Sequence, residues 1–476
     1  MIENYSDNNV FEFFRLMSEN GINYVSWKNN HEIEKFIKKG SDLDIYIPIR
    51  YKNQFLYMAS KNGWISVFNP VAKFKSIEHF YHLGLNGRLY HLHVYFEIIT
   101  GESWIKEFRF PIGDFLINNR CKHKEFDLYV LDDKSQAYLF ALRHLLKSAS
   151  IVSRLVYLQD FDSYRSEWQL CNFDVNKLRG YGPILLDDRI DRSGLQAEFR
   201  LSSYINSVIF RFEIKSYLRI NYFLLPLYRV RSFIVRLYNK IITKRKKLLK
   251  NRGVVLAISG VDGAGKTSMV DMLDLTFSRF LTVKRLSLGK PQGRILESIR
   301  KSIYGERRYN SVTQGKNGIR TIGFLRIVSS LALALLRVIE SNKAKYYAGK
   351  GYIVVVDRWP TKERGKMDGP KIHVNKSSNI FIRALSRFEG SIYELMPAAD
   401  VCLFLDVPVE TAIKRNSMRA KGDKETDIEI HQRHAENLGI KPISEKFIRF
   451  DNNGLLEEKT KELQFLVCNE LASYNR

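Results

Sequence analysis

The chain has 476 residues, of which 45% are hydrophobic and 13% aromatic. This composition is enough for buried cores, and it excludes a disordered chain, a collagen-like repeat and a small disulfide-stapled fold. At roughly 150 residues per domain, the length predicts about three domains. The net charge of +25 at pH 7 favours anionic partners, such as nucleotides, phosphorylated glycans or an acidic membrane surface.

The cysteines and the first residues bear on the compartment. The four cysteines lie far apart and form no C-x-x-C pair, which argues against a zinc ribbon and is typical of a reduced compartment. The chain starts with early acids and lacks the basic stretch and apolar run of a secretory signal. We therefore expect a cytoplasmic protein, and the sequence leaves its oligomeric state open, a dimer included.

Two carboxylates mark the N-terminal part. A helix-like pattern over residues 9–19 and a strand-like run over 24–28 precede the segment GSDLDIYI at residues 40–47. In a strand, Asp42 and Asp44 point to the same face, so their carboxylates converge as paired Mg²⁺ sites require. The motif resembles the nucleotidyltransferase fold of the DNA polymerase β type, and that resemblance implies a third carboxylate from a neighbouring strand.

The strand-like segment over residues 89–98, LYHLHVYFEI, is the best source of that third ligand. Its alternation predicts that Tyr90, Leu92, Val94, Phe96 and Ile98 face a core, and that His91, His93, Tyr95 and Glu97 face the other way. A histidine then replaces the third acid, unless Glu97 reaches the site. Histidine suits softer metals than Mg²⁺, so Asp42, Asp44 and His93 are candidate ligands of an altered metal site. A retired catalytic site and a merely polar surface stay open, and we favour a degenerate module that recognises an acceptor or a nucleotide.

An amphipathic helix is predicted over residues 132–158, starting at an acidic cap. Its Arg143, His144 and Lys147 either line the cleft beside Asp42 and Asp44 or face solvent, and the pattern leaves both open.

The charge of the chain is concentrated in residues 211–252, which hold thirteen Lys and Arg against one acid, Glu213. Aromatic and aliphatic residues recur at intervals of three and four, which predicts a basic amphipathic helix interrupted near Pro226. Such a helix either contacts an anionic membrane from the cytoplasmic side or connects two domains with a solvated basic face, and the connector is the default expectation. Nucleic acid is a weaker candidate, because no recognised nucleic-acid module accompanies the charge.

A phosphate-binding loop opens the C-terminal half. The apolar run VVLAIS at residues 254–259 predicts a buried parallel strand, and GVDGAGKT follows at residues 260–267, before a helix-like run. In such a loop backbone N–H groups surround a phosphate, the lysine neutralises phosphate oxygens, and the threonine hydroxyl can ligate Mg²⁺. The expected cofactors are ATP and Mg²⁺. The expected nucleotide-binding residues are Gly260, Gly263, Gly265, Lys266, Thr267 and Ser268, with Thr267 as a metal ligand.

Two further apolar runs, at residues 352–356 and 401–405, alternate with helical segments. The first delivers Asp357 and Arg358 at its carboxyl end, where ligands bind in open α/β sheets. The predicted fold class is therefore α/β for the C-terminal half, with a parallel sheet and helices on both faces. An α+β N-terminal domain and a helical connector precede it.

The loop, the Asp357-Arg358-Trp359 segment and LDVPVETAIKR at residues 405–415 occur in the order seen in thymidylate kinases, which residues 253–476 resemble. The resemblance implies that Asp262 orients the acceptor and that Arg358, Arg337 and a cation at Arg294 bind its anionic group. It also implies that Asp357 lies near Mg²⁺ or the attacking oxygen, and that a mobile lid carries Arg415, Arg419 and Lys421.

Two departures from the family bear on the acceptor. Leu333 stands where thymidylate kinases place the aromatic residue that stacks on thymine, and PTKERGKMDGP follows Trp359 in place of the family's nucleotide-seating residues. We therefore expect transfer of the γ-phosphoryl of ATP to an anionic or saccharide acceptor other than dTMP. A sugar or lipid-linked glycan of surface-polysaccharide assembly is preferred, because fusions resembling this one tend to be associated with it. The alternatives are a nucleoside monophosphate kinase, an active nucleotidyltransferase and an ATP-switched scaffold without turnover.

The predicted domain organisation follows from these patterns. It comprises a nucleotidyltransferase-like domain at 1–130, its helical extension at 131–202, a basic connector at 203–252 and a thymidylate kinase-like domain at 253–476.

Overall fold

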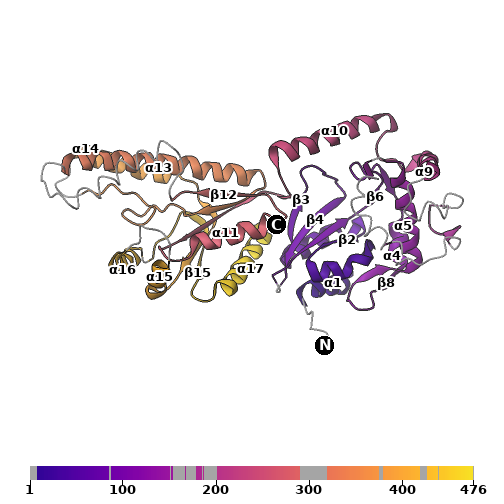
Figure 1. Cartoon of the computed structure of the whole chain (residues 1–476), viewed down its shortest axis with the longest axis horizontal. Coiled ribbons are helices and arrows are strands. Elements are labelled where there is room, and N and C mark those ends of the chain that lie inside the picture. The colour runs from indigo at the N-terminus through magenta and orange to yellow at the C-terminus, as the bar shows by residue number, and fades with distance from the viewer. Residues whose placement is uncertain are drawn as a thin grey trace. The chain divides into compact units, whose positions relative to one another are not determined.

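The computed structural model describes residues 8–84, 87–150, 152–153, 167, 178–184, 186, 201–289, 319–374, 379–418, 426–437 and 439–474. The chain divides into two compact units, Met1–Lys247 together with Leu471–Arg476, and Leu248–Glu470. Figure 1 labels the helices and strands of both units. The predicted site residues Arg294, Arg419 and Lys421 lie outside the described residues.

A mixed sheet forms the centre of the first unit. Within the unit its order is β3 (Ile65–Phe68), β4 (Ile77–Leu83), β5 (Leu89–Tyr95), β2 (Asp42–Tyr46), β1 (Val25–Lys28), β9 (Tyr129–Leu131) and β8 (Arg120–Lys122). The pairs β2–β5 and β1–β9 are parallel, and the other neighbours are antiparallel. A small second sheet pairs β6 (Ile98–Thr100) with β7 (Phe108–Phe110).

Helices cover both faces of this sheet. On one face α1 (Asn8–Glu19), α2 (Ile33–Lys39) and α3 (Lys52–Lys61) share a core with Leu43 and Ile45. On the other face α5 (Asp133–Ser148) and α9 (Leu201–Glu213), with the short α4 (Gly113–Asn118), share a core with Tyr46 and Tyr95. Because side chains alternate along a strand, Asp42 and Asp44 lie on the face of Tyr46, which α5 covers.

Two predicted boundaries in this unit were wrong. The helix capped by Asp132, whose carboxylate accepts from Ser135 N at 2.7 Å, ends at Ser148 and not near residue 158. There Ser148 Oγ donates back to His144 O at 2.8 Å, a contact that competes with helix continuation. The strand predicted over residues 89–98 ends at Tyr95, and since the chain turns there, Ile98 joins the opposite core.

The basic segment forms α9, the turn η5 (Lys215–Tyr217), the turn η6 (Tyr222–Leu224), α10 (Leu225–Tyr238) and the π-helical turn η7 (Asn239–Thr243). The predicted interruption is confirmed, since Pro226 stands in the first turn of α10, where its missing N–H leaves no helix bond unmade. None of the described helices has both the length and the apolar character that crossing a bilayer requires.

A five-stranded parallel sheet forms the centre of the second unit, as predicted. Its order is β12 (Val283–Ser287), β13 (Ile353–Asp357), β11 (Val254–Gly260), β14 (Ala399–Asp406) and β15 (Ser444–Asp451), and the short β10 (Leu248–Leu249) precedes β11. After β11 the chain adds β12 and β13 on one side and β14 on the other. The carboxyl end of β11 is therefore a topological switch point, where ligands bind in such sheets.

Helices flank this sheet: α11 (Lys266–Phe277), α13 (Ile319–Gly349), α14 (Ile380–Glu394), α15 (Val409–Ser417), α16 (Asp427–Glu436) and α17 (Leu456–Tyr474). The long α13 packs Ala344 and Ala348 against Val255 and Val354 of the sheet. Figure 1 shows α14 lying alongside α13. The α/β fold class with a parallel sheet is thus observed directly.

Candidate functional site

The predicted phosphate-binding loop joins β11 to α11. Gly263 and Gly265 adopt φ values of 86° and 84°, a left-handed conformation that glycine takes without strain. A Cβ atom on Gly263 would lie 2.8 Å from Ala412 O, so a side chain does not fit there. Because Gly265 is the N-cap of α11, the N–H groups of the first helical turn are free to bind an anion.

Lys266 is the charged group of this loop. Its side chain is buried, and its Nζ donates to Val261 O at 2.7 Å and lies 3.7 Å from Asp262 Oδ1. Burial, with a further contribution from the nearby charge of Arg358, lowers the pKa of Lys266 to about 8. Thr267 and Ser268 follow it in the first helical turn and are exposed. The loop therefore brings the predicted nucleotide-binding residues together.

Arg358 reaches the loop from the end of β13. The parallel register pairs Asp357 with Ile258, and Arg358 N donates to Ile258 O at 2.9 Å. Arg358 then adopts a φ of 69°, which is strained for a residue with a Cβ and costs about 1–3 kcal/mol. Its Nη2 donates to Asp262 Oδ1 at 2.9 Å. The strained turn thus aims the guanidinium at the loop.

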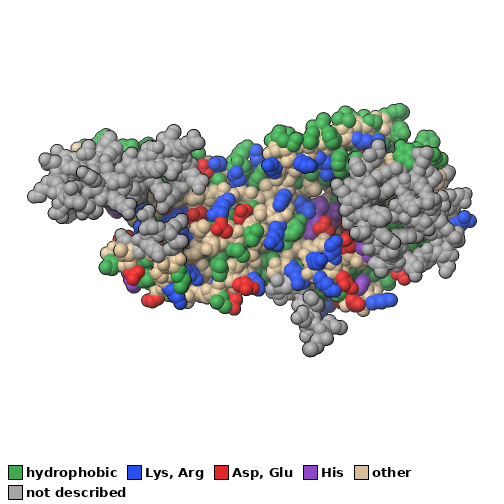
Figure 2. Space-filling view, viewed as in Figure 1, with side chains coloured by type: hydrophobic (Ala, Val, Ile, Leu, Met, Phe, Trp, Pro, Cys, Tyr) green, Lys and Arg blue, Asp and Glu red, His purple; other side chains and the backbone are tan. Residues whose placement is uncertain are grey.

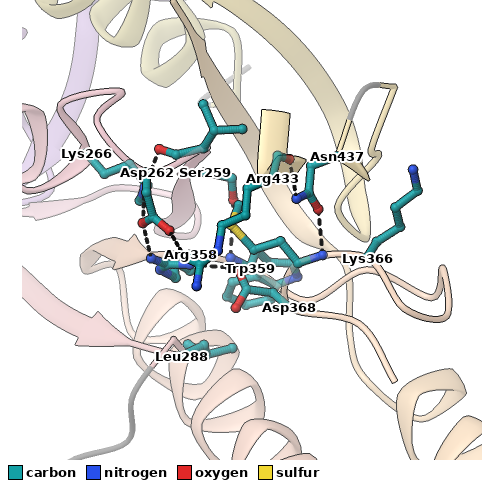
Figure 3. Close-up of polar contacts among 12 residues, drawn as sticks. Ser259, Asp262, Lys266, Leu288, Arg358, Trp359, Lys366, Asp368, Arg433 and Asn437 are labelled. Atoms are coloured by element: carbon teal, nitrogen blue, oxygen red, sulfur yellow. Dashed lines mark hydrogen bonds and ion pairs between the residues drawn. The ribbon is translucent and has the colours of Figure 1, made fainter. Parts of the chain in front are cut away.

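Asp262 is the meeting point of the cations at this site. Arg433, from α16, places Nη1 2.5 Å from Asp262 Oδ2, and Figure 3 shows Asp262 between Lys266, Arg358 and Arg433. Although burial opposes ionisation, the positive charges of these three residues lower the pKa of Asp262 to about 2. Asp262 is therefore a weak base, suited to accepting a hydrogen bond and unsuited to removing a proton.

Asp368 and Arg337 form a buried pair behind Arg358. Arg337 is 2% exposed, and it donates to Leu288 O at 3.0 Å, Asp368 O at 3.0 Å, Asp368 Oδ1 at 2.7 Å and Tyr393 Oη at 2.7 Å. These bonds use four of the five guanidinium N–H groups, so in this structure Arg337 is bound mainly to neighbouring residues, and its predicted acceptor contact stays a prediction. Asp368 has a strained φ of 62°, and its Oδ2 lies 3.6 Å from Arg358 Nη1. Arg337 thus positions Asp368, which in turn positions Arg358.

Arg415 lies beside the phosphate-binding loop. Its Nη2 donates to Asn452 O at 2.9 Å, and Asn452 Nδ2 donates to Ala264 O at 2.7 Å. Arg415 Nη1 is buried and bonds to no residue in the described part of the chain. The predicted lid residue Arg415 is therefore close enough to the loop to act on a bound phosphate.

Sequence reasoning missed three residues of this site: Asp368, Arg433 and Asn452. Asn452 directly follows β15, so the rule that ligands bind at the carboxyl ends of parallel strands could have found it. No local pattern singles out Asp368 or Arg433.

Thr267 and Asp357 fit a magnesium ion. Asp357 Oδ1 is buried, and no described residue donates a hydrogen bond to it, so this carboxylate oxygen still needs a partner. In the described residues no group of three or more His, Cys, Asp and Glu is arranged to hold a metal ion. Nucleotide sites bind Mg²⁺ through one or two protein ligands, phosphates and water, and Thr267 and Asp357 could be such ligands.

In the first unit the predicted carboxylates face two histidines. The parallel register sets Asp42 opposite His91 and Asp44 opposite His93. His91 Nδ1 lies 2.5 Å from Asp42 Oδ1, and His93 Nδ1 lies 2.9 Å from Asp44 Oδ1. Burial lowers the pKa of His93 to about 4, so its ring is neutral at pH 7. Asp42 and Asp44 thus lie on one face of β2, each beside a histidine of β5.

The metal site predicted from those three residues is not formed among the described residues. Asp44 Oδ1 also lies 3.0 Å from Lys28 Nζ, and Asp44 Oδ2 accepts from Asn29 Nδ2 at 3.2 Å. Although burial opposes it, the charge of Lys28 lowers the pKa of Asp44 far below its ordinary value. Asp44 thus pairs with a protein cation at the place where a metal would bind.

Basic side chains cluster around Asp44. They are Lys28, Lys106, Arg143 and Lys147, and the neighbouring carboxylates are Asp42 and Glu167. Lys28 Nζ and Lys106 Nζ lie 3.0 Å and 3.4 Å from Tyr95 Oη. Burial, reinforced by the charge of Lys28, lowers the pKa of Lys106 to about 7. Two residues of this cluster, Asn29 and Lys106, have strained φ values of 57° and 50°.

The helix α5 supplies half of these cations. Arg143 Nη1 pairs with Glu167 Oε1 at 2.7 Å, and Arg143 Nη2 lies 3.4 Å from Asn29 Oδ1. One turn later, burial and the charge of Arg143 lower the pKa of Lys147 well below its ordinary value. Arg143 and Lys147 therefore line the site, whereas His144 is buried beside Ser148.

Comparisons with known proteins give likeness only to solved structures. The chain matches no family model and no curated protein. A thymidylate kinase from Candida albicans is 15% identical, with a TM-score of 0.28, over 46% of this chain and 94% of that chain. A deoxyadenosine kinase from M. mycoides, with dCMP and dCDP bound, is 13% identical, with a TM-score of 0.27, over 45% of this chain and 98% of that one.

Proposed function

We propose that the second unit is an ATP-dependent phosphotransferase acting on an anionic or saccharide acceptor. The observation that carries this proposal is the contact of Arg358, from the end of β13, with Asp262 inside the phosphate-binding loop. It supports this proposal because it brings the Arg358 guanidinium close to Lys266, and we assign acceptor binding to the first and nucleotide binding to the second. Phosphoryl transfer needs this arrangement, because its catalysis depends on positioning and on stabilising spread negative charge.

When bound, ATP·Mg²⁺ would supply the γ-phosphoryl group and the charge of the metal. The residues of this chain do the remaining work. The loop N–H groups, Lys266 and Arg415 hold and neutralise phosphate oxygens, and Thr267 and Asp357 would hold the metal. Arg358 and Arg433 bind the anionic group of the acceptor. Asp262, which stays ionised, accepts a hydrogen bond from the acceptor hydroxyl and so orients it.

The test is ADP formation by the full chain with Mg·ATP, alone and with candidate acceptors, using Lys266→Ala as the blank. We take sugars and lipid-linked glycans of surface-polysaccharide assembly as the first acceptors to test, and dTMP and other nucleoside monophosphates as the alternative class. Stimulation by one acceptor, lost in the blank, supports the proposal and names the acceptor. Turnover that persists in Lys266→Ala would overturn it, and strong stimulation by one monophosphate would favour a nucleotide kinase.

The first unit has a separate candidate function, the binding of a phosphate-bearing molecule. Its support is the group of buried basic side chains there, Lys28, Lys106, Arg143 and Lys147, because a bound phosphate would stabilise the protonated form of the two lysines whose pKa burial lowers. An active nucleotidyltransferase is the less favoured alternative, because Lys28 and His93 already contact the Asp44 oxygen that a metal would need.

Calorimetry with inorganic phosphate and pyrophosphate tests this second function, in a Lys266→Ala background that removes the lysine of the other site. Binding that is lost in Lys147→Met supports a phosphate site in the first unit. Release of pyrophosphate from a nucleoside triphosphate, abolished by Asp44→Ala, would instead establish the nucleotidyltransferase.

A further inference from the structure

The helix α10 packs with its polar side inward and its apolar side outward. Two arginines of α10 contact the rest of its unit. Arg229 Nε donates to Glu102 Oε2 at 2.9 Å, and the guanidinium of Arg236 lies 4.9 Å from the ring centre of Trp104. Leu225 is the one buried hydrophobic residue of this helix. An amphipathic helix of a soluble domain ordinarily buries its apolar face. On α10 the apolar side is therefore exposed, in addition to basic residues such as Arg231.

The outward side is an apolar stripe that continues into η7. Its members follow one another at intervals of three and four, as one helix face requires. They are Leu227, Val230, Ile234, Leu237 and Ile241, with exposed fractions of 64%, 56%, 57%, 43% and 62%. Phe223, just before α10, is 87% exposed. Figure 2 shows hydrophobic side chains crowded along α10 at the upper edge of the view. Contiguous apolar surface of this kind marks an interaction site.

The charge around the stripe has one sign. From Ile214 to Val261 the sequence contains twelve Lys and Arg and no acid. Arg231, Lys240, Lys244 and Lys246 are exposed on α10, η7 and the residues after them. A second copy of this chain would bring the same cations against one another, which is unfavourable. An anionic lipid surface complements them and covers the apolar stripe as well.

The geometry also fits a helix lying in the plane of a bilayer. At 1.5 Å per residue, the 14 residues of α10 extend about 21 Å, which is shorter than the ~30 Å hydrocarbon core. Tyr228 and Tyr238 are exposed beside the stripe, and tyrosine prefers the boundary between lipid and water. Arginine and lysine stems beside an apolar face reach back to the headgroups.

We propose that α10 and η7 bind this protein peripherally to an anionic membrane surface, with the apolar stripe inserted among the lipids and the flanking cations at the headgroups. The proposal does not depend on the function of either unit. It uses two independent features, the outward apolar stripe and the absence of acids from residues 214–261.

The test is flotation of the full chain with vesicles of phosphatidylcholine alone or mixed with phosphatidylglycerol. The stripe variant is Leu227→Gln, Ile234→Gln and Leu237→Gln combined. The matched control is Ile380→Gln with Phe381→Gln, since these residues on α14 are 83% and 58% exposed but lie outside the basic segment. Circular dichroism checks that each variant folds, as expected for changes at exposed positions.

The wild-type chain and the control should float with the phosphatidylglycerol vesicles and not with phosphatidylcholine alone. The stripe variant should lose at least about a hundredfold in apparent affinity, because three large apolar side chains no longer insert. The single variants Lys240→Ser and Lys244→Ser should each weaken vesicle binding about fivefold. Flotation of the stripe variant equal to wild type would overturn the proposal. So would a wild-type oligomer that binds no vesicles and becomes monomeric in the stripe variant, because a second copy then covers the stripe.

Discussion

Arg358 Nη2 lies 2.9 Å from Asp262 Oδ1, and this bond joins the end of β13 to the phosphate-binding loop after β11. The two residues are far apart in sequence, and the parallel register of β11 with β13 brings them together. Arg358 holds a strained backbone to make the contact. Such strain persists where the surrounding structure enforces it, and it concentrates at functional sites.

Arg358→Ala should lower kcat/KM for the acceptor about 10²–10³-fold, because one guanidinium that stabilises developing charge is removed. The KM for ATP should change less, since Lys266 and the N–H groups of the loop remain in place. Steady-state kinetics with varied acceptor and varied ATP measures both effects. Arg387→Ala, an exposed arginine on α14, is the matched control and should behave as wild type. An equal loss of affinity for both substrates would contradict the assigned role.

The lowered pKa of Lys266, about 8, predicts a pH dependence of ATP use. As pH rises through 8, the free enzyme loses the ammonium charge that attracts phosphate, so kcat/KM for ATP should fall, approaching tenfold per pH unit above pH 8. Below pH 8 the charge is present and this group causes no change. Initial rates from pH 6.5 to 9.5 test the prediction, and Lys266→Arg should abolish the fall because arginine stays protonated. A flat wild-type profile to pH 9.5 would show that this lysine keeps its proton.

Arg337→Leu should destabilise the second unit by about 3–5 kcal/mol, because the buried Asp368 loses its nearest charged partner and keeps only Arg358, 3.6 Å away. The free energy of unfolding in urea measures this loss. The double variant Arg337→Leu with Asp368→Asn should recover part of it, since the orphaned charge is then removed. If Arg337→Leu keeps wild-type stability and only raises the KM of the acceptor, the acceptor contact inferred from the family resemblance is supported.

Gly263→Ala should both weaken nucleotide binding and destabilise the fold. Its left-handed φ of 86° costs a Cβ-bearing residue about 1 kcal/mol, and the Cβ would also meet Ala412 O at 2.8 Å. Gly439→Ala is the control, because its φ is 77° and nothing lies within 4 Å of the added Cβ. Thermal unfolding with and without Mg·ATP compares the two variants. Only Gly263→Ala should lose the increase in Tm that the nucleotide produces.

Lys106 should titrate near pH 7, because burial and the charge of Lys28 disfavour its ammonium form. Reductive ¹³C-methylation of the full chain, with Lys106→Arg to assign the signal, allows its pKa to be measured by NMR. Inorganic phosphate should raise this pKa, since a bound anion stabilises the charged form. An ordinary lysine pKa near 10.4, unchanged by phosphate, would count against the proposed phosphate site in the first unit.

Several features of this protein could be predicted from the sequence, because short segments determine them. The run VVLAIS followed by GVDGAGKT predicts a strand, a phosphate-binding loop and a helix, and Lys266 and the loop glycines lie as expected. Asp132 caps a helix, and Pro226 opens one. The alternation in β2 and β5 placed Asp42 and Asp44 on one face and His91 and His93 opposite them. In each case neighbours within a few residues decide the conformation.

Only the tertiary structure decided how distant residues are paired. Asp368 and Arg433 complete the site around Asp262 from segments without a motif. Arg337, in the position where the resemblance implied an acceptor contact, makes internal bonds to Leu288, Asp368 and Tyr393. These outcomes depend on which strands neighbour one another and on which acceptor packs against each donor.

The basic segment shows the same limit. Its residue spacing established a helix with an apolar and a polar side, but spacing does not say which side the rest of the protein covers. The contacts of Arg229 with Glu102 and of Arg236 with Trp104 decided that the polar side faces inward. Periodicity is a property of one helix, whereas burial is a property of the helix and its surroundings, and the sequence of the helix contains only the first.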